Sequence, residues 1–206
     1  MTMKKLKMLF LTCGAIFSAK IQAQSIGGLA QAGIYSANYT NPNGQDENVT
    51  GKGHFQIGAT YEIKLDNKGQ ICIPLILNYT QFGTEQSILE NQFMSQKAKT
   101  INIGAGGKYF FIDDRYSLRP FAAATISYEA LVNSNYTYEG TQMGKLDWRS
   151  NAFFGLQTGI GIETGLNLRL DIYANYNLGL LNRIDKQDYG TYKDQMLGLG
   201  INFIFN

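Results

Sequence analysis

Residues 151–181 constrain the fold more than any other part of the chain. Mainly apolar side chains occupy every second position in two runs, which Thr164-Gly165 separates. These positions are Phe154, Leu156, Thr158, Ile160 and Ile162 in the first run, and Leu168, Leu170, Ile172, Ala174, Tyr176, Leu178 and Leu180 in the second. Because successive strand side chains point to opposite faces, the pattern predicts two strands, each with one apolar and one polar face. Both runs exceed the usual length of about five or six residues and reach the roughly 9–11 that a tilted strand needs to cross a bilayer.

Similar alternation recurs along the chain and predicts eight strands. We expect them at residues 28–39, 54–65, 70–82, 99–111, 118–132, 151–163, 166–181 and 194–206. Long polar loops are expected at 40–53, 83–98, 133–147 and 182–193, and they alternate with tight turns. Short turns on one side and longer loops on the other are typical of outer-membrane barrels. The sequence therefore predicts an all-β fold, an eight-stranded antiparallel up-and-down transmembrane β-barrel.

The strand that begins at residue 70 contains a proline. Pro74 cannot donate a hydrogen bond to a neighbouring strand, so we expect a bulge or a break near the start of this strand.

The first 23 residues have the pattern of a secretory signal peptide. Lys4, Lys5 and Lys7 precede a short apolar run, and Ile21-Gln22-Ala23 is a plausible cleavage site. Residues 24–206 would then form a single barrel domain with both termini on the periplasmic, short-turn side. Cleavage removes four lysines and no acid from 18 basic and 16 acidic residues, which leaves a net charge of −2 and no reason to expect a nucleic-acid partner. It also leaves Cys72 as the single cysteine, so no internal disulfide is expected.

Periodicity alone does not decide which face of the barrel lies inside. A soluble lipocalin-like carrier would turn its apolar face inward, whereas a membrane barrel turns it towards lipid. The polar face is rich in glycine, which suits the crowded interior of a small barrel, and its charges balance, as enclosed charges must. We therefore predict a polar network inside the barrel that comprises Glu62, Lys64, Lys108, Arg119, Glu129, Gln157, Glu163, Arg169 and Asp171.

A repeated tyrosine motif predicts a ring of aromatic residues at one membrane interface. Asn-Tyr-Thr occurs at 38–40, 78–80 and 135–137, and Asn-Tyr-Asn occurs at 175–177, each near the long-loop end of an outward-running strand. Amphipathic aromatic side chains gather at such interfaces. The predicted aromatic girdle comprises Tyr39, Tyr79, Tyr136, Trp148, Tyr176, Phe203 and Phe205.

The whole pattern resembles the small eight-stranded outer-membrane barrels, the group that includes OmpX and the membrane domain of OmpA. The segments Leu-Arg-Pro-Phe-Ala-Ala-Ala at 118–124 and Gly-Ile-Gly-Ile-Glu at 159–163 are most similar to PorT-like barrels of Bacteroidota, as is the Gln-Ala-Gln at 22–24. The resemblance implies a Gram-negative outer membrane, contact with its lipid and lipopolysaccharide, and insertion by its assembly machinery. The chain departs from the group at its end, where Asn206 follows Phe205 instead of a terminal aromatic residue. We expect no peptidoglycan-binding segment of the OmpA kind.

The sequence offers few residues for catalysis. His54 is the single histidine, which excludes a multi-histidine metal site, and we expect it at the rim, hydrogen-bonded to a loop. Cys72 is expected to be a buried, unreactive thiol. Residues 148–151, Trp-Arg-Ser-Asn, resemble the His-x-Ser-Asn motif of lipid A deacylase barrels, but Trp148 replaces the base that would activate Ser150. The chain is therefore expected to have no catalytic residues, no cofactor and no metal.

These observations favour a non-enzymatic barrel with a filled polar lumen and a structural or surface-interaction role. Binding of an extracellular protein or another surface ligand would then involve the loops, at Asp46, Glu47, Tyr136, Tyr138, Trp148, Tyr189 and Tyr192. A narrow channel or an accessory barrel for secretion or transport is the first alternative. A lipid A-modifying enzyme and a soluble carrier are the others.

Overall fold

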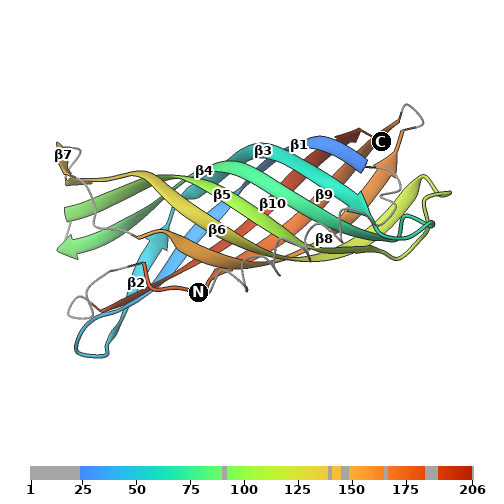
Figure 1. The fold of residues 1–206 in the computed structure, drawn as a ribbon. Helices are drawn as coiled ribbons and strands as arrows, with labels where there is room; N and C mark the ends of the chain where they lie inside the picture. The colour runs from blue at the N-terminus through green and yellow to red at the C-terminus, as the bar shows by residue number, and fades with distance from the viewer. Residues whose placement is uncertain are drawn as a thin grey trace, which may run out of the picture.

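The computed structural model describes residues 24–89, 92–138, 141–144, 149–164, 167–183 and 190–205, so the predicted signal peptide lies outside the described residues. Eight long strands form the wall of a barrel: β1 (Gln24–Thr40), β3 (Gly53–Lys64), β4 (Ile71–Leu89), β5 (Gln92–Phe110), β6 (Leu118–Tyr138), β8 (Asn151–Glu163), β9 (Leu168–Gly179) and β10 (Thr191–Phe205). Two short strands, β2 (Asp46–Gly51) and β7 (Thr141–Gly144), pair with the wall strands at one end. The wall strands pair antiparallel in sequence order, and β10 returns to pair with β1 (Figure 1). The predicted eight-stranded antiparallel barrel is thus confirmed.

The pairing is staggered around the barrel. Starting at Ile26 on β1, partner residues can be followed through Tyr61, Leu75, Ala105, Ile126, Phe154, Leu178 and Gln195. The path returns to β1 at Ser36, ten residues beyond its start. Such a stagger accompanies strands that tilt by about 35–45°, and an eight-stranded barrel of this kind has an interior that side chains fill.

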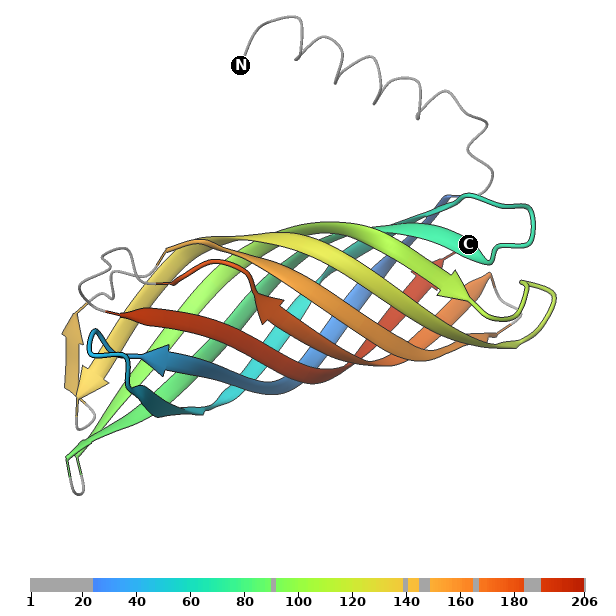
Figure 2. The ribbon, with the colours of Figure 1, turned by 90° about the horizontal axis from the view of Figure 1, so that it is seen from below.

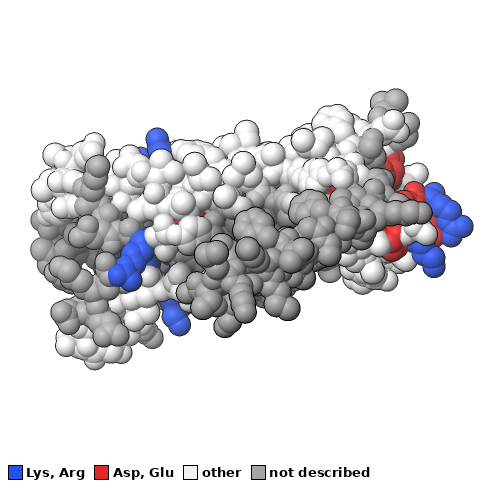
Figure 3. All heavy atoms as spheres, viewed as in Figure 1, with Lys and Arg blue, Asp and Glu red and all other residues white. Residues whose placement is uncertain are grey.

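Burial alternates along most of each wall strand, with mainly apolar side chains outside and mainly polar ones inside. Ile103, Ile126 and Leu199 are 64%, 63% and 71% exposed, whereas Glu129, Arg169 and Asp171 are fully buried. Figure 3 shows the result as a largely uncharged middle section of the visible wall, with charged side chains towards the two ends. The soluble-carrier alternative requires the opposite arrangement, because a carrier holds its ligand against an apolar interior.

Tight turns join the strands at the end where both β1 begins and β10 ends. In the turn before β4, Asp66 accepts hydrogen bonds from the backbone N–H of Lys68 (3.3 Å) and of Ile71 (2.8 Å), and Gly69 supplies a positive φ of 61°. In the turn before β6, the Arg115 guanidinium bonds to Asp113 and lowers the pKa of that carboxyl. These carboxylates satisfy backbone groups that a tight turn would otherwise leave unpaired.

The opposite, long-loop end is more regular than the sequence predicts. The expected loop at 83–98 is wrong, because β4 and β5 continue as a paired hairpin from Phe82↔Ala98 to Leu89↔Gln92. Figure 2 shows this hairpin projecting beyond the rest of the wall. Polar residues such as Thr84 and Glu85 follow one another there, so the alternation that marks a membrane strand weakens although the two strands stay paired. For the same reason β6 extends past its predicted end at residue 132.

Two irregularities of the wall bear on the sequence predictions. Lys99 pairs with Asn133 and Thr100 with Leu131, so Val132 is an extra residue in a β-bulge. The break expected at Pro74 occurs only on the side of β4 that faces β5. Cys72 and Leu75 pair with β5 but Pro74 does not, whereas Pro74 still pairs with Glu62 of β3.

The interior has no room for side chains at several glycines, and this generates a prediction. A Cβ on Gly200 would collide with the Tyr173 ring, whereas a Cβ on Gly107, which faces outward, would meet nothing within 4 Å. We expect Gly200→Ala to lower the free energy of unfolding by about 1–3 kcal/mol, the usual cost of overpacking a close-packed interior. Gly107→Ala should leave it unchanged or slightly raised. Urea unfolding of the two variants in phospholipid vesicles measures the difference, and equal stabilities would contradict this account of the interior.

Candidate functional site

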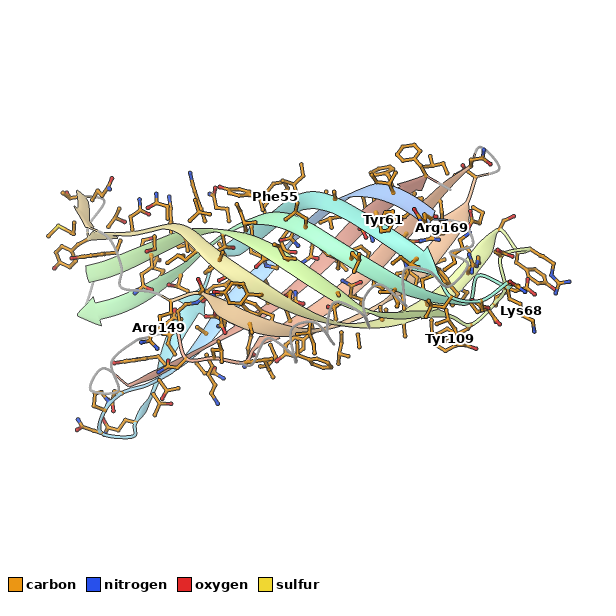
Figure 4. The ribbon with its side chains drawn as sticks, in the orientation of Figure 1. Phe55, Tyr61, Lys68, Tyr109, Arg149 and Arg169 are labelled. Atoms are coloured by element: carbon orange, nitrogen blue, oxygen red, sulfur yellow. The ribbon has the colours of Figure 1, made fainter. Side chains whose placement is uncertain are left out.

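Four charged side chains meet inside the barrel near its short-turn end, and we call them the turn-end cluster: Glu62, Lys108, Arg169 and Asp171. Lys108 Nζ donates to Glu62 Oε1 (2.8 Å) and to Asp171 Oδ2 (2.5 Å). Arg169 donates through Nε to Asp171 Oδ1 (2.8 Å) and through Nη2 to Glu62. All four are buried, and Figure 4 labels Arg169 at this end of the barrel. Because two cations face two carboxylates, the cluster is neutral and each buried charge has a partner.

Aromatic rings surround the turn-end cluster. Lys108 Nζ lies 4.8 Å from the centre of the Phe110 ring and 4.3 Å from that of Phe121, and the Arg169 guanidinium lies 4.8 Å from that of Phe110. Arg119, 4.0 Å from the same Phe110 ring, donates to Glu163 (3.2 Å) and to the carbonyl oxygen of Gly69. Cation–π contacts of this kind strengthen where water is excluded. Charges and rings together fill this end of the lumen.

A second group of buried polar side chains occupies the other end, and we call it the loop-end cluster: Tyr35, Glu129, Asn151, Arg183 and Asp194. The Arg183 guanidinium donates to both Glu129 and Asp194. Asp194 also accepts hydrogen bonds from the Tyr35 hydroxyl (2.5 Å) and from Asn151 Nδ2 (2.8 Å). Four strands and one loop thus contribute to a single network.

Arg183 follows β9, and it connects two loops to the interior. Its backbone N–H donates to Tyr192 (3.0 Å), and its carbonyl accepts from the backbone N–H of Arg149 (2.9 Å). Its side chain lies over the rings of Phe82 (5.3 Å) and Phe153 (5.9 Å). The first loop residues after β9 and those before β8 are therefore held against the mouth of the barrel.

A small chamber lies between the two clusters. Its volume is about 50 Å³, enough for only a few water molecules. Amide side chains dominate its lining: Gln31, Gln56, Asn78, Asn102, Gln157, Asn175, Asn177 and Asn202. Asn102 Nδ2, for example, donates to Asn78 Oδ1 (2.8 Å) and Thr80 Oγ1 (2.7 Å). The amide groups can hold water and carry no charge. Glu62 and Lys108 of the turn-end cluster also line the chamber, and they bind each other.

The residues predicted for the lumen are distributed over these three regions. Four form the turn-end cluster, Arg119 and Glu163 pair below it, Glu129 belongs to the loop-end cluster, and Gln157 lines the chamber. Lys64, half-buried at the end of β3, takes part in no ion pair among the described residues. The prediction missed Arg183 and Asp194. Alternation along β10 places Asp194 on the same face as the inward Met196, which was a usable signal, whereas Arg183 lies in a loop and no periodicity marks it.

The predicted aromatic girdle is only partly on the outer wall. Tyr176, Phe203 and Phe205 are exposed there, and Tyr79 is half-buried between its neighbours. Tyr39 was assigned wrongly, because it pairs with inward-facing Tyr192 and packs against the buried aromatic side chains of the loop end.

Tyr136 also departs from its predicted outward position. It pairs with buried Gln96, since the bulge at Val132 shifts the alternation of β6 by one residue. Trp148 lies outside the described residues. The tyrosine motif does not include Phe55 and Tyr128, which are also exposed on the outer wall towards the long-loop end. Figure 4 labels Phe55 on this wall.

His54 and Cys72 are both buried. The sequence predicts a hydrogen bond from His54 to a loop. In the structure, His54 Nε2 lies instead 3.0 Å from Gln31 Nε2, on the adjacent strand β1. Cys72 packs with Phe110, Phe121 and Tyr173. The described residues contain no group of three or more His, Cys, Asp or Glu side chains that could hold a metal ion. Among the same residues, no helix is long and apolar enough to cross a membrane.

Residues 9–205 match the model of a family described as the outer membrane protein beta-barrel domain. The chain belongs to this family. It is a protein of the outer membrane, and the predicted location is therefore confirmed. The finer likeness to PorT-like barrels stays a prediction. A search of curated proteins found no match.

Solved barrels resemble the structure at low sequence identity. OprG from Pseudomonas aeruginosa is 11% identical with a TM-score of 0.55, and the match covers 87% of this chain and 95% of that one. Neisserial surface protein A is 16% identical with a TM-score of 0.47, over 88% and 98% of the two chains. The outer membrane protease OmpT from Escherichia coli is 10% identical with a TM-score of 0.48, over 91% and 99%. At such identities the likeness to OprG supports the fold alone.

The turn-end cluster generates a prediction about stability. We expect Arg169→Met to lower the free energy of unfolding by about 3–5 kcal/mol, because it leaves two buried carboxylates with one cation. Arg115→Met is the matched control, since the Arg115–Asp113 pair is exposed at a turn and should contribute little. Urea unfolding in lipid vesicles compares the two, and a loss of similar size in both would contradict the assigned role of the cluster.

Proposed function

We propose that this protein is a non-enzymatic outer-membrane barrel with a closed lumen, which acts as a structural and surface-interaction protein through its loops. The observation that carries the proposal is the pair of buried charge clusters, one near each end of the lumen. Each cluster joins strands from different parts of the wall, and the small amide-lined chamber lies between them.

The clusters weigh against a channel. A solute that crossed the lumen would have to separate Lys108 and Arg169 from their carboxylates, and then Arg183 from Glu129 and Asp194. Leaving such charges buried without partners costs several kcal/mol for each ion. A narrow channel or a transport accessory that conducts through the lumen is therefore disfavoured.

The position of Ser150 weighs against a lipid-modifying enzyme. Its hydroxyl accepts a hydrogen bond from the backbone N–H of Leu131 (3.2 Å), which ties the loop to β6. The chain's single histidine, His54, is on β3 and adjoins Gln31, so its position supports no role as a base for this serine.

The loops offer the surfaces for partners. Asp46 and Glu47 lie on β2, where this strand folds back along β1, and Tyr138 ends the extension of β6. Tyr192 is buried in the loop-end packing, so we withdraw it from the proposed binding residues. Trp148 and Tyr189 lie outside the described residues. An extracellular protein or surface ligand would meet this end, while lipid, lipopolysaccharide and the assembly machinery would contact the wall.

The closed lumen is tested by planar-bilayer recording. We expect no steady conductance from the wild-type barrel, because both clusters block the path. Arg183→Ser alone should change little, since the turn-end cluster remains, whereas Arg169→Ser with Arg183→Ser should allow ion flow. A heat-dependent shift in gel mobility checks that each variant is folded. Steady wild-type channels would contradict the proposal.

The role of the loops is tested by shortening them. We expect a barrel whose four loops are shortened, but which keeps Arg183 and its two carboxylate partners, to retain its heat-dependent mobility, since the wall and the loop-end cluster stay intact. In a deletion strain this barrel should restore the integrity of the envelope but not surface adhesion, which the wild type should restore. Adhesion restored equally by both barrels would rule out a loop-mediated role.

A further inference from the structure

Near the long-loop end, the outer wall changes from apolar to polar between two successive rows of paired residues. The last apolar row across β4, β5 and β6 comprises Tyr79, Ile101 and Ala130. The next row comprises Gln81, Lys99 and Asn133, and all three are exposed. On a membrane barrel such a change marks the edge of the hydrocarbon layer. Lys99 is therefore at the depth of the lipid headgroups.

Two more lysines lie beside Lys99. Lys97 is the next outward residue of β5 and pairs with Gly83 on β4. On the other side of Gly83, the backbone N–H of Lys52 donates to its carbonyl oxygen (3.0 Å). Lys52, between β2 and β3, thus lies beside Lys97 and Lys99 of β5, and the three lysines form one basic patch next to β4.

The basic patch carries a net positive charge. Glu85, the acid in contact with it, pairs with Lys52, and Lys52 Nζ also lies 3.4 Å from Ser95 Oγ. Among the described residues, Lys97 and Lys99 take part in no ion pair and are exposed. At the short-turn end, by contrast, Arg115 is paired with Asp113.

We propose that this patch binds the phosphate groups of lipid A in the outer leaflet. Lysine ammonium groups bind phosphate as point charges, and each one near an anionic membrane surface strengthens binding roughly fivefold. The position of the lysines favours a lipid over a soluble polyanion, because they project sideways from the wall at the edge of the apolar band, where headgroups lie. Figure 3 shows lysine and arginine spheres on the visible wall towards the long-loop end. The inference requires the outer-membrane location and is independent of any role of the loops.

The test uses the protein purified from outer membranes in a non-ionic detergent. After its insertion into phospholipid nanodiscs, its binding of labelled diphosphoryl lipid A in the same bilayer is compared with its binding of labelled dephosphorylated lipid A. We expect the protein to bind lipid A only when the phosphates are present. The triple variant Lys52→Gln, Lys97→Gln, Lys99→Gln should bind it at least about tenfold more weakly. The matched control, Lys68→Gln with Arg115→Gln at the short-turn end, should bind like the wild type.

Several outcomes would overturn the inference. These are binding that ignores the phosphates, a triple variant that binds as well as the wild type, and an equal loss in the control. Inorganic phosphate and heparin serve as soluble competitors. If heparin binds through the three lysines while lipid A in the discs does not, the patch recognises a soluble polyanion and the lipid assignment is wrong. The heat-dependent mobility shift verifies that every variant is folded.

Discussion

The pairing of β10 with β1 is the contact on which the rest of the structure depends. It runs from Ile26↔Phe205 to Thr40↔Thr191 and leaves the wall without an open edge. A sheet in lipid cannot leave backbone groups unpaired, because the hydrocarbon offers them no hydrogen bonds. Closure with eight strands then fixes a narrow interior, and polar side chains that point into it must find partners there.

The buried charges meet this requirement by bonding across the lumen. The turn-end cluster joins β3, β5 and β9, and the loop-end cluster joins β1, β6, β8 and β10 with the loop after β9. The turn-end cluster thus connects strands that are not paired with one another, and the loop-end cluster connects the β1–β10 pair with the β6–β8 pair. The same contacts that brace the barrel also obstruct it, so mechanical support and a closed lumen have one physical origin. Surface recognition is left to the outer wall and the loops.

The sequence was sufficient to predict the strands and their faces, because alternation is imposed by the bilayer on every residue between the two interfaces. It failed where that constraint ends. The extension of β4 and β5 beyond Phe82 is held by backbone pairing, and successive polar residues such as Thr84 and Glu85 leave no regular apolar–polar alternation. Tyr136 was misplaced because nothing in the local sequence marks the extra residue at Val132. Arg183 was missed because it is a loop residue whose inward position depends on Glu129 and Asp194, which are distant in the sequence.

The hydrogen bond from Tyr35 to Asp194 has a consequence for how the barrel forms. It crosses the seam between the first and last strands, and the same carboxylate binds Arg183. Until β10 arrives, Arg183 lacks one of its two carboxylates and Tyr35 has no acceptor across the seam. Intermediates that lack the last strand therefore carry uncompensated polar groups, which makes the final step of assembly close to all-or-none. A barrel without β10 would therefore lack the Asp194 hydrogen bonds as well as the backbone pairing with β1.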